Sequence, residues 1–197
     1  MIYDLRIAIF AALGVAVVRA DDSAWRVWLE PKFMHAPVAV SLADAQKTQI
    51  AAGMLSEDGF RSFTKVEFAA LGVSREVFHS VAVLNASIDL RSADFRFVRD
   101  RRGIISYGVV ESRQPRVASA VLAPGFLGLW KETLGDAVLV VVPNRFTAFV
   151  FPRLASDYMD YAPMVFRAYR DTAYPVSAEV FAVSADGWRC IGAYAEP

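Results

Sequence analysis

The chain is poor in the residues from which reactive sites are built. Among its 197 residues it has one cysteine, Cys190, and two histidines, His35 and His79. A single cysteine excludes an intramolecular disulfide, and its neighbours Trp188 and Ile191 favour a buried thiol within a strand. Neither histidine has the spacing of a metal-binding pair, so the sequence predicts no metal site.

The chain also lacks an excess of charge of either sign. Its 21 basic and 21 acidic residues balance, which leaves no overall field to attract nucleic acid or an anionic membrane. The densest basic group, residues 99–102, contains an aspartate and is typical of a solvated turn. Glycine-rich phosphate loops and the Gly-x-Ser-x-Gly nucleophile elbow are missing as well. We therefore predict no nucleic-acid partner and no cofactor, and the sequence assigns no catalytic residue.

No apolar run is as long as the roughly 20 residues that a membrane-spanning helix needs. Residues 1–20 instead combine Arg6 in a short polar start, the apolar run Ile7–Val18 and the small residue Ala20 at the end. This order is typical of a secretory signal peptide. We expect cleavage after Ala20, which leaves residues 21–197 as an exported (periplasmic or secreted) bacterial protein with no stable membrane span. The alternative is that the first 20 residues form a core segment of a cytoplasmic protein.

Apolar residues, in contrast, are abundant. They make up 55% of the chain, with 14 Phe, which is enough for the core of one domain. The clearest pattern is a pair of apolar runs, Ala137–Val142 and Phe146–Phe151, around Pro143 and Asn144. It predicts a β-hairpin whose strands are buried on both faces, as in the centre of a sheet.

Weaker patterns predict the remaining elements. Ser74 can cap a helix that has one apolar stripe. The stripe consists of Val77, Val81, Leu84 and Ile88. The other expected elements are a half-buried edge strand over 25–30, a helix from Ser41 to about Met54, hairpins over 95–111 and 176–193, a short helix over 126–134, and a helix from about Asp160 with Pro163 in its first turn. Together they predict an α+β fold: a single compact domain with a mostly antiparallel sheet and several packed helices.

The tip of the apolar hairpin carries the best candidate for a ligand-binding site. Asn144 and Arg145 place polar groups at the end of rigid strands, where a guanidinium can bind a carboxylate or a phosphate. The alternative is ordinary turn chemistry followed by a solvated arginine.

A second candidate is a partner-binding surface made of tyrosines, because Tyr is frequent in the hot spots of protein interfaces. It consists of Tyr158, Tyr161, Tyr169 and Tyr174. The alternative is that these residues form the core face of one helix and its exit.

The order of four segments over residues 71–194 resembles the YtpQ-like family, an uncharacterised bacterial group defined as a domain of unknown function. The segments are LGVSREVFHSVAVLN, ASAVLAPGFLGLW, GDAVLVVVPNRFTAFVF and PVSAEVFAVSADGWRCIG. The resemblance implies a compact α/β or α+β domain and no established reaction. The family pattern favours an acidic residue after Arg145, where this chain has Phe146. Family members are also typically cytosolic, whereas this chain begins with an export-like segment.

These observations favour a non-enzymatic module that binds an unknown protein or small molecule. The alternative is a hydrolase or transferase whose site assembles from dispersed residues near Arg145. Asn144, His79 and Asp136 are the other candidates for such a site.

Overall fold

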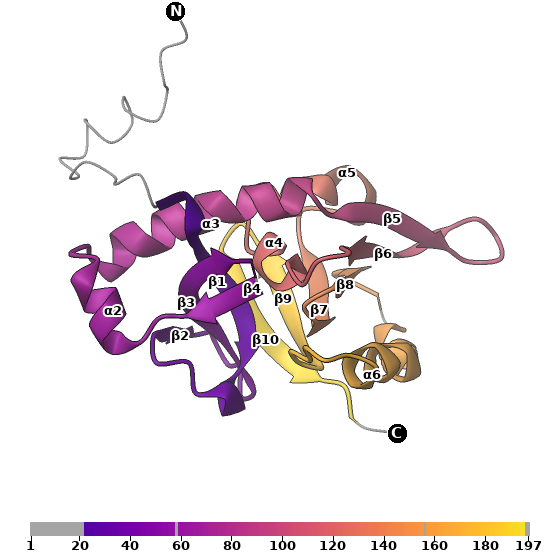
Figure 1. Cartoon of the computed structure of the whole chain (residues 1–197). Coiled ribbons are helices and arrows are strands. Elements are labelled where there is room, and N and C mark those ends of the chain that lie inside the picture. Colours follow the sequence, from indigo (N-terminus) through magenta and orange to yellow (C-terminus); the bar gives the residue numbers. More distant parts are fainter. Residues whose placement is uncertain (1–21, 58, 156, 196–197) are drawn as a thin grey trace, which may run out of the picture.

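Two antiparallel sheets organise the chain, and helices pack around them (Figure 1). The computed structural model describes residues 22–57, 59–155 and 157–195, so the expected signal peptide, residues 1–20, lies outside the described residues. Within them the expected fold class is confirmed: the protein is a single compact α+β domain with antiparallel sheets.

The described residues form ten strands. The four-stranded sheet contains β1 (Trp25–Pro31), β2 (Ala39–Ser41), β3 (Thr48–Ser56) and β4 (Gly59–Ser62). The six-stranded sheet contains β5 (Asp94–Arg99), β6 (Ile105–Glu111), β7 (Val138–Asn144), β8 (Thr147–Pro152), β9 (Glu179–Ser184) and β10 (Gly187–Ala193). The α-helices are α2 (Lys65–Ala70), α3 (Arg75–Arg91), α4 (Val117–Ala120), α5 (Lys131–Leu134) and α6 (Ala162–Arg170).

The predicted apolar hairpin forms the centre of the six-stranded sheet, whose order is β10-β9-β7-β8-β6-β5. Val138 and Val140 of β7 belong to a buried cluster that also contains Trp28 of the four-stranded sheet. Leu139 and Val141, which point to the opposite face, pack in a cluster with residues of α6. Because both faces of the sheet are covered, its central strands are apolar at almost every position.

The turn of this hairpin lies two residues later than predicted. Pro143 and Asn144 still belong to β7, and Arg145 and Phe146 form the turn. The ladder between β7 and β8 has an irregularity between Val141 and Asn144, where β7 has one residue more than β8.

The helix expected from Ser41 to about Met54 is wrong. The segment contains the end of β2 and most of β3, which pairs antiparallel with both β1 and β2. Asp44, expected in the first helical turn, has a φ of 62°, which belongs to the left-handed region and ends regular structure there. Pairing on both sides of β3 outweighs the helix propensity of its alanines.

The first strand is more buried than the expected half-buried edge strand. All seven residues of β1 are buried, including Arg26 and Glu30. Leu29 packs toward the six-stranded sheet, while Trp25 packs with Phe78 of α3. The alternation of apolar and charged residues correctly predicted a strand, but both charged side chains have buried partners instead of solvent.

The long helix α3 begins at the predicted cap, Ser74, whose side chain accepts the N–H of Val77 at 3.3 Å. Its predicted apolar stripe is wrong for two of four positions, since Leu84 is 56% exposed and Ile88 is 39% exposed. The buried face instead contains Phe78, Val81, Ala82, Ala86, Asp89 and Leu90. Small alanines let β1 approach this face closely, and the buried aspartate pairs with a cation from β1.

The other expected elements agree with the structure to within a few residues. The hairpins over 95–111 and 176–193 are β5–β6 and β9–β10. A short 3₁₀ turn, Tyr158–Tyr161, precedes α6, and a proline lies in the first turn of that helix, as predicted. Residues 126–134 form a 3₁₀ turn followed by α5.

Candidate functional site

Asn144, the first residue of the predicted ligand site, is 5% exposed at the end of β7. Its Nδ2 donates a hydrogen bond to the carbonyl of Ala168 at 2.6 Å, and its Oδ1 accepts the N–H of Phe146 at 2.8 Å. The first bond ties the hairpin to α6, and the second closes the turn. The side chain therefore supports the turn from inside the protein.

Arg145, the second residue of that predicted site, lies between the two sheets. Its side chain is 11% exposed, and its Nη2 donates to Oε1 of Glu30 at 2.8 Å. Because Glu30 belongs to β1 and Arg145 to the β7–β8 turn, the ion pair connects the four-stranded sheet with the six-stranded sheet.

Three aromatic rings surround the guanidinium of Arg145. Its central carbon lies 5.9 Å from the ring of Trp28, 5.8 Å from that of Phe60 and 5.5 Å from that of Tyr174. The rings of Trp28 and Phe60 stack, with centroids 4.9 Å apart. A cation over ring faces is attracted by their negative charge density, so these rings stabilise the charge of a guanidinium that has lost most of its water.

Burial raises the pKa of the Glu30 carboxyl above its ordinary value, and the positive charge of Arg145 offsets this only in part. Burial likewise lowers the pKa of Arg145, against the opposing effect of Glu30. Both directions have the same cause, which is the cost of removing charges from water. Removing these two charges from water costs free energy. The stability that the pair contributes to the fold therefore depends on pH.

We expect Glu30 to stabilise the fold most at low pH. Its pKa is raised in the folded state, so this contribution is complete below the ordinary value of 4.5 and is lost as the pH rises through the folded-state pKa. Glu30→Gln removes the titration. As the pH rises through this range, the parent protein loses stability at this site and the Glu30→Gln variant does not. The free energy of unfolding of the variant minus that of the parent, both measured by urea denaturation, should therefore increase. A difference that stays constant with pH would contradict the assignment.

The four tyrosines of the predicted partner surface do not form one group. The ring of Tyr161 lies 5.0 Å from that of Tyr107 and packs on the six-stranded sheet. The carbonyl of Tyr158 accepts the hydroxyl of Tyr194 at 2.7 Å. Tyr169 is half-buried on α6, while Tyr174 is 40% exposed and covers Arg145. Their partner-binding role stays a prediction, and the structure gives at least two of them a packing role.

The dispersed residues named for an enzymatic site are also separated. Asp136 is exposed and pairs with Lys131 at 3.0 Å. His79 borders a narrow apolar groove between the four-stranded sheet and α3, and burial lowers its pKa. Across the described residues, no hydrogen bond or ion pair joins two of Arg145, Asn144, His79 and Asp136. The hydrolase or transferase alternative therefore stays a prediction.

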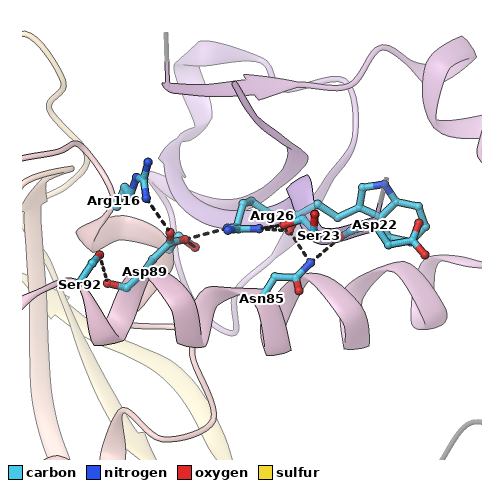
Figure 2. A network of polar contacts seen from close by, with 9 residues as sticks. Asp22, Ser23, Arg26, Asn85, Asp89, Ser92 and Arg116 are labelled. Carbon is cyan, nitrogen blue, oxygen red and sulfur yellow. Dashed lines mark hydrogen bonds and ion pairs between the residues drawn. The ribbon is translucent and has the colours of Figure 1, made fainter. Parts of the chain in front are cut away.

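A buried network that sequence analysis missed connects β1 with α3 (Figure 2). The side chain of Arg26 runs along α3 and donates from Nε to Oδ2 of Asp89 at 2.9 Å. The same carboxylate oxygen accepts the hydroxyl of Ser119 of α4 at 2.8 Å. Asn85, one turn earlier on α3, donates to the carbonyl of Trp25 at 3.2 Å. These contacts hold the start of β1 against the helix.

A second missed carboxylate, Glu179 of β9, is 2% exposed. Its Oε1 accepts the N–H groups of Gln46 and Lys47 at 2.7 and 3.0 Å, and its Oε2 accepts the hydroxyl of Thr48 at 2.6 Å. It joins the six-stranded sheet to the start of β3. In the sequence it is one acidic residue among 21, so only its apolar neighbours in a strand hinted at burial.

The most exposed strand of the protein is β5, which lies at one edge of the six-stranded sheet and pairs only with β6. Five of its six residues are exposed. The β5–β6 hairpin extends away from the rest of the domain, at the right in Figure 1, because β6 pairs with β8 only over Gly108–Glu111. At the opposite edge, the N–H of Cys190 in β10 bonds the carbonyl of Ala43 at 2.9 Å. The edge at β5 has no such cover among the described residues.

Two phenylalanines of β5 are held in place although they reach solvent. Phe95 and Phe97 are 40% and 39% exposed. Their ring centroids lie 6.2 and 5.7 Å from the ring of Trp130, which they meet edge to face. Trp130 occupies this position because Gly108, the partner of Phe97 in β6, has no side chain: a Cβ there would lie 2.3 Å from the indole. The sheet thus presents two partly exposed aromatic rings, both packed against Trp130, beside a free edge.

No family model, curated protein or solved structure matches this chain. The resemblance to the YtpQ-like family therefore stays a prediction. In the described part of the chain, no helix is long and apolar enough to cross a membrane. No group of three or more His, Cys, Asp or Glu side chains among those residues is arranged to hold a metal ion.

Proposed function

We propose that this protein is an exported, non-enzymatic binding module that pairs β5 with an extended segment of another protein. The observation that carries the proposal is the free edge of β5 with Phe95 and Phe97 fixed beside it. An exposed sheet edge binds extended peptides through main-chain hydrogen bonds, and neighbouring side chains supply specificity. Aromatic side chains that are already ordered lose little entropy on binding, which makes them effective anchors.

Charges on the hairpin favour an acidic partner. Arg96 pairs with Glu111, and Arg102 pairs with Asp100 within the turn. No carboxylate pairs with the two remaining arginines, Arg99 and Arg101, in the described part of the chain. A partner strand that alternates apolar with acidic residues fits this edge, because its apolar side chains meet the phenylalanines and its carboxylates reach guanidinium groups that have no carboxylate partner among the described residues.

The same charges disfavour pairing between two copies of β5. An antiparallel pair that fully overlaps residues 94–98 places Arg96 opposite Arg96 of the second copy. Like charges directly opposite each other destabilise a strand pair. Natural sheets use charged residues on edge strands in this way to avoid self-association. The edge is therefore selective for a different, acidic segment.

We expect a capped peptide that alternates valine with glutamate to protect the backbone amides of residues 94–99 from hydrogen exchange. In the free protein, the N–H groups on the outer side of β5 have no strand partner, so they exchange rapidly. Peptide pairing slows them. Hydrogen–deuterium exchange followed by NMR measures this protection, and a peptide that alternates valine with lysine is the control.

The phenylalanine anchors provide the matched variants. Phe95→Ser combined with Phe97→Ser should weaken binding of the glutamate peptide by at least about tenfold. Leu84→Ser combined with Ile88→Ser changes residues that are 56% and 39% exposed on α3 and should leave binding unchanged. Thermal unfolding of each variant checks that the domain is folded. Equal protection by both peptides, or equal loss of binding in both variants, would rule out β5 as the binding edge.

A further inference from the structure

A cavity lies at the other half of the six-stranded sheet, away from β5. It has a volume of about 430 Å³, which is within the range of small-molecule sites in proteins. Its lining comes from the end of β9, the start of β10 and the turn between them, from the residues just before β7 and just after β8, and from Ala43. Sheet pairing brings these segments together, since Val183 of β9 lies opposite both Val138 of β7 and Trp188 of β10.

We infer that this cavity binds a small aromatic carboxylate. Two arginines, Arg153 and Arg189, contribute to its lining, together with the indole of Trp188 and the single acidic residue Asp186. The lining thus has two positive charges and one negative charge. A guanidinium binds a carboxylate through two parallel hydrogen bonds, and the indole offers an apolar face for a flat ring.

The two arginines differ in how free they are to bind. Arg189 lies 3.7 Å from the carboxylate of Asp44, and both side chains are mostly exposed. At this distance and exposure the pair contributes little, so a ligand carboxylate can replace Asp44. Arg153 is exposed and makes no hydrogen bond or ion pair with another described residue. Among the described residues, Arg153 therefore has no polar contact that an anion would have to displace.

Trp188 is suited to the role of a rigid wall. Its ring centroid lies 5.7 Å from that of Phe181 and 6.4 Å from that of Phe126, and both of these residues are buried. Trp188 is half-buried and belongs to the cavity lining, so its contacts with the core hold one residue of the cavity wall in place. A flat ligand ring gains contact with this surface without requiring the protein to rearrange.

Benzoate is the probe that tests the assignment. We expect a saturable shift of the Trp188 indole N–H resonance in two-dimensional NMR, with a dissociation constant of about 10 mM or tighter for a ligand of this size. Trp188→Phe identifies the resonance. Benzamide, which has the same shape but no charge, should bind at least about fivefold more weakly if the arginines recognise the carboxylate. Inorganic phosphate separates anion binding from recognition of the ring.

Variants of the exposed arginines complete the test without disturbing the core. Arg153→Gln and Arg189→Gln should each weaken benzoate binding by about fivefold or more, whereas Arg101→Gln on the distant hairpin turn should have no effect. The inference is overturned if benzoate gives no saturable shift, if benzamide binds equally well, or if phosphate binds as tightly as benzoate. These outcomes do not involve β5, so they are independent of the proposed protein-binding function.

Discussion

Replacement of Asp89 by alanine is expected to lower the free energy of unfolding by about 3–5 kcal/mol. The carboxylate is fully buried and accepts hydrogen bonds from both Arg26 and Ser119. Its removal leaves the guanidinium of Arg26, whose side chain is 3% exposed, without a carboxylate partner inside the protein. An uncompensated buried charge is one of the few single changes that destabilises a domain this strongly.

Chemical denaturation with urea measures this loss, and Asp136→Ala provides the control. Asp136 also pairs with a cation, but its side chain is 80% exposed, so its removal should change stability by no more than about 0.5 kcal/mol. A double replacement, Asp89→Leu with Arg26→Met, should recover part of the stability because it removes both buried charges. If Asp89→Ala is as stable as Asp136→Ala, the network does not hold β1 to α3.

The fold was most predictable where a strand is buried on both of its faces. The strands β7 and β8 are apolar at almost every position, and this pattern already indicates the centre of a sheet. The β5–β6 and β9–β10 hairpins were predictable because their turns are short and their strands lie next to each other in the sequence. Ser74 and Pro163 marked the starts of α3 and α6 through local chemistry that needs no distant partner.

The failures have a common physical cause, which is pairing between distant segments. The strand β3 has a helix-like composition, and it becomes a strand because β1, a separate segment earlier in the sequence, pairs with it. The buried face of α3 was misplaced because an aspartate counts as polar in any hydrophobic pattern. Asp89 is buried only because Arg26, 63 residues earlier, neutralises it. A single sequence carries no signal for such a match.

The candidate sites show the same limit. The alternation of Phe95 and Phe97 predicted a strand, but the free edge depends on the order of strands in the sheet. The cavity at the β9–β10 turn is lined by segments more than 100 residues apart. Arg145, in contrast, was predicted to bind a ligand carboxylate or phosphate, and in the structure its guanidinium binds the protein's own Glu30; its ligand-binding role stays a prediction.

Arg145→Ala is accordingly expected to lower the free energy of unfolding by about 3–5 kcal/mol. The change removes the partner of the buried Glu30 carboxylate and the contacts of the guanidinium with three aromatic rings. Arg101→Ala, at the exposed turn between β5 and β6, should stay within about 0.5 kcal/mol of the parent protein. Urea denaturation of the two variants provides the comparison.

A double-mutant cycle then separates a structural arginine from a ligand-binding one. Because the two charges interact, the loss for Glu30→Gln with Arg145→Ala should be smaller than the sum of the two single losses. Additive losses would show that the ion pair does not couple the sheets. If Arg145→Ala is fully stable, the guanidinium is dispensable for folding, and its placement among Trp28, Phe60 and Tyr174 would favour the ligand-binding role that the sequence first indicated. Large losses of stability that are coupled would instead assign Arg145 a structural role at the junction of the two sheets. Ligand and partner binding would then be left to the edge of β5 and to the cavity at β9 and β10.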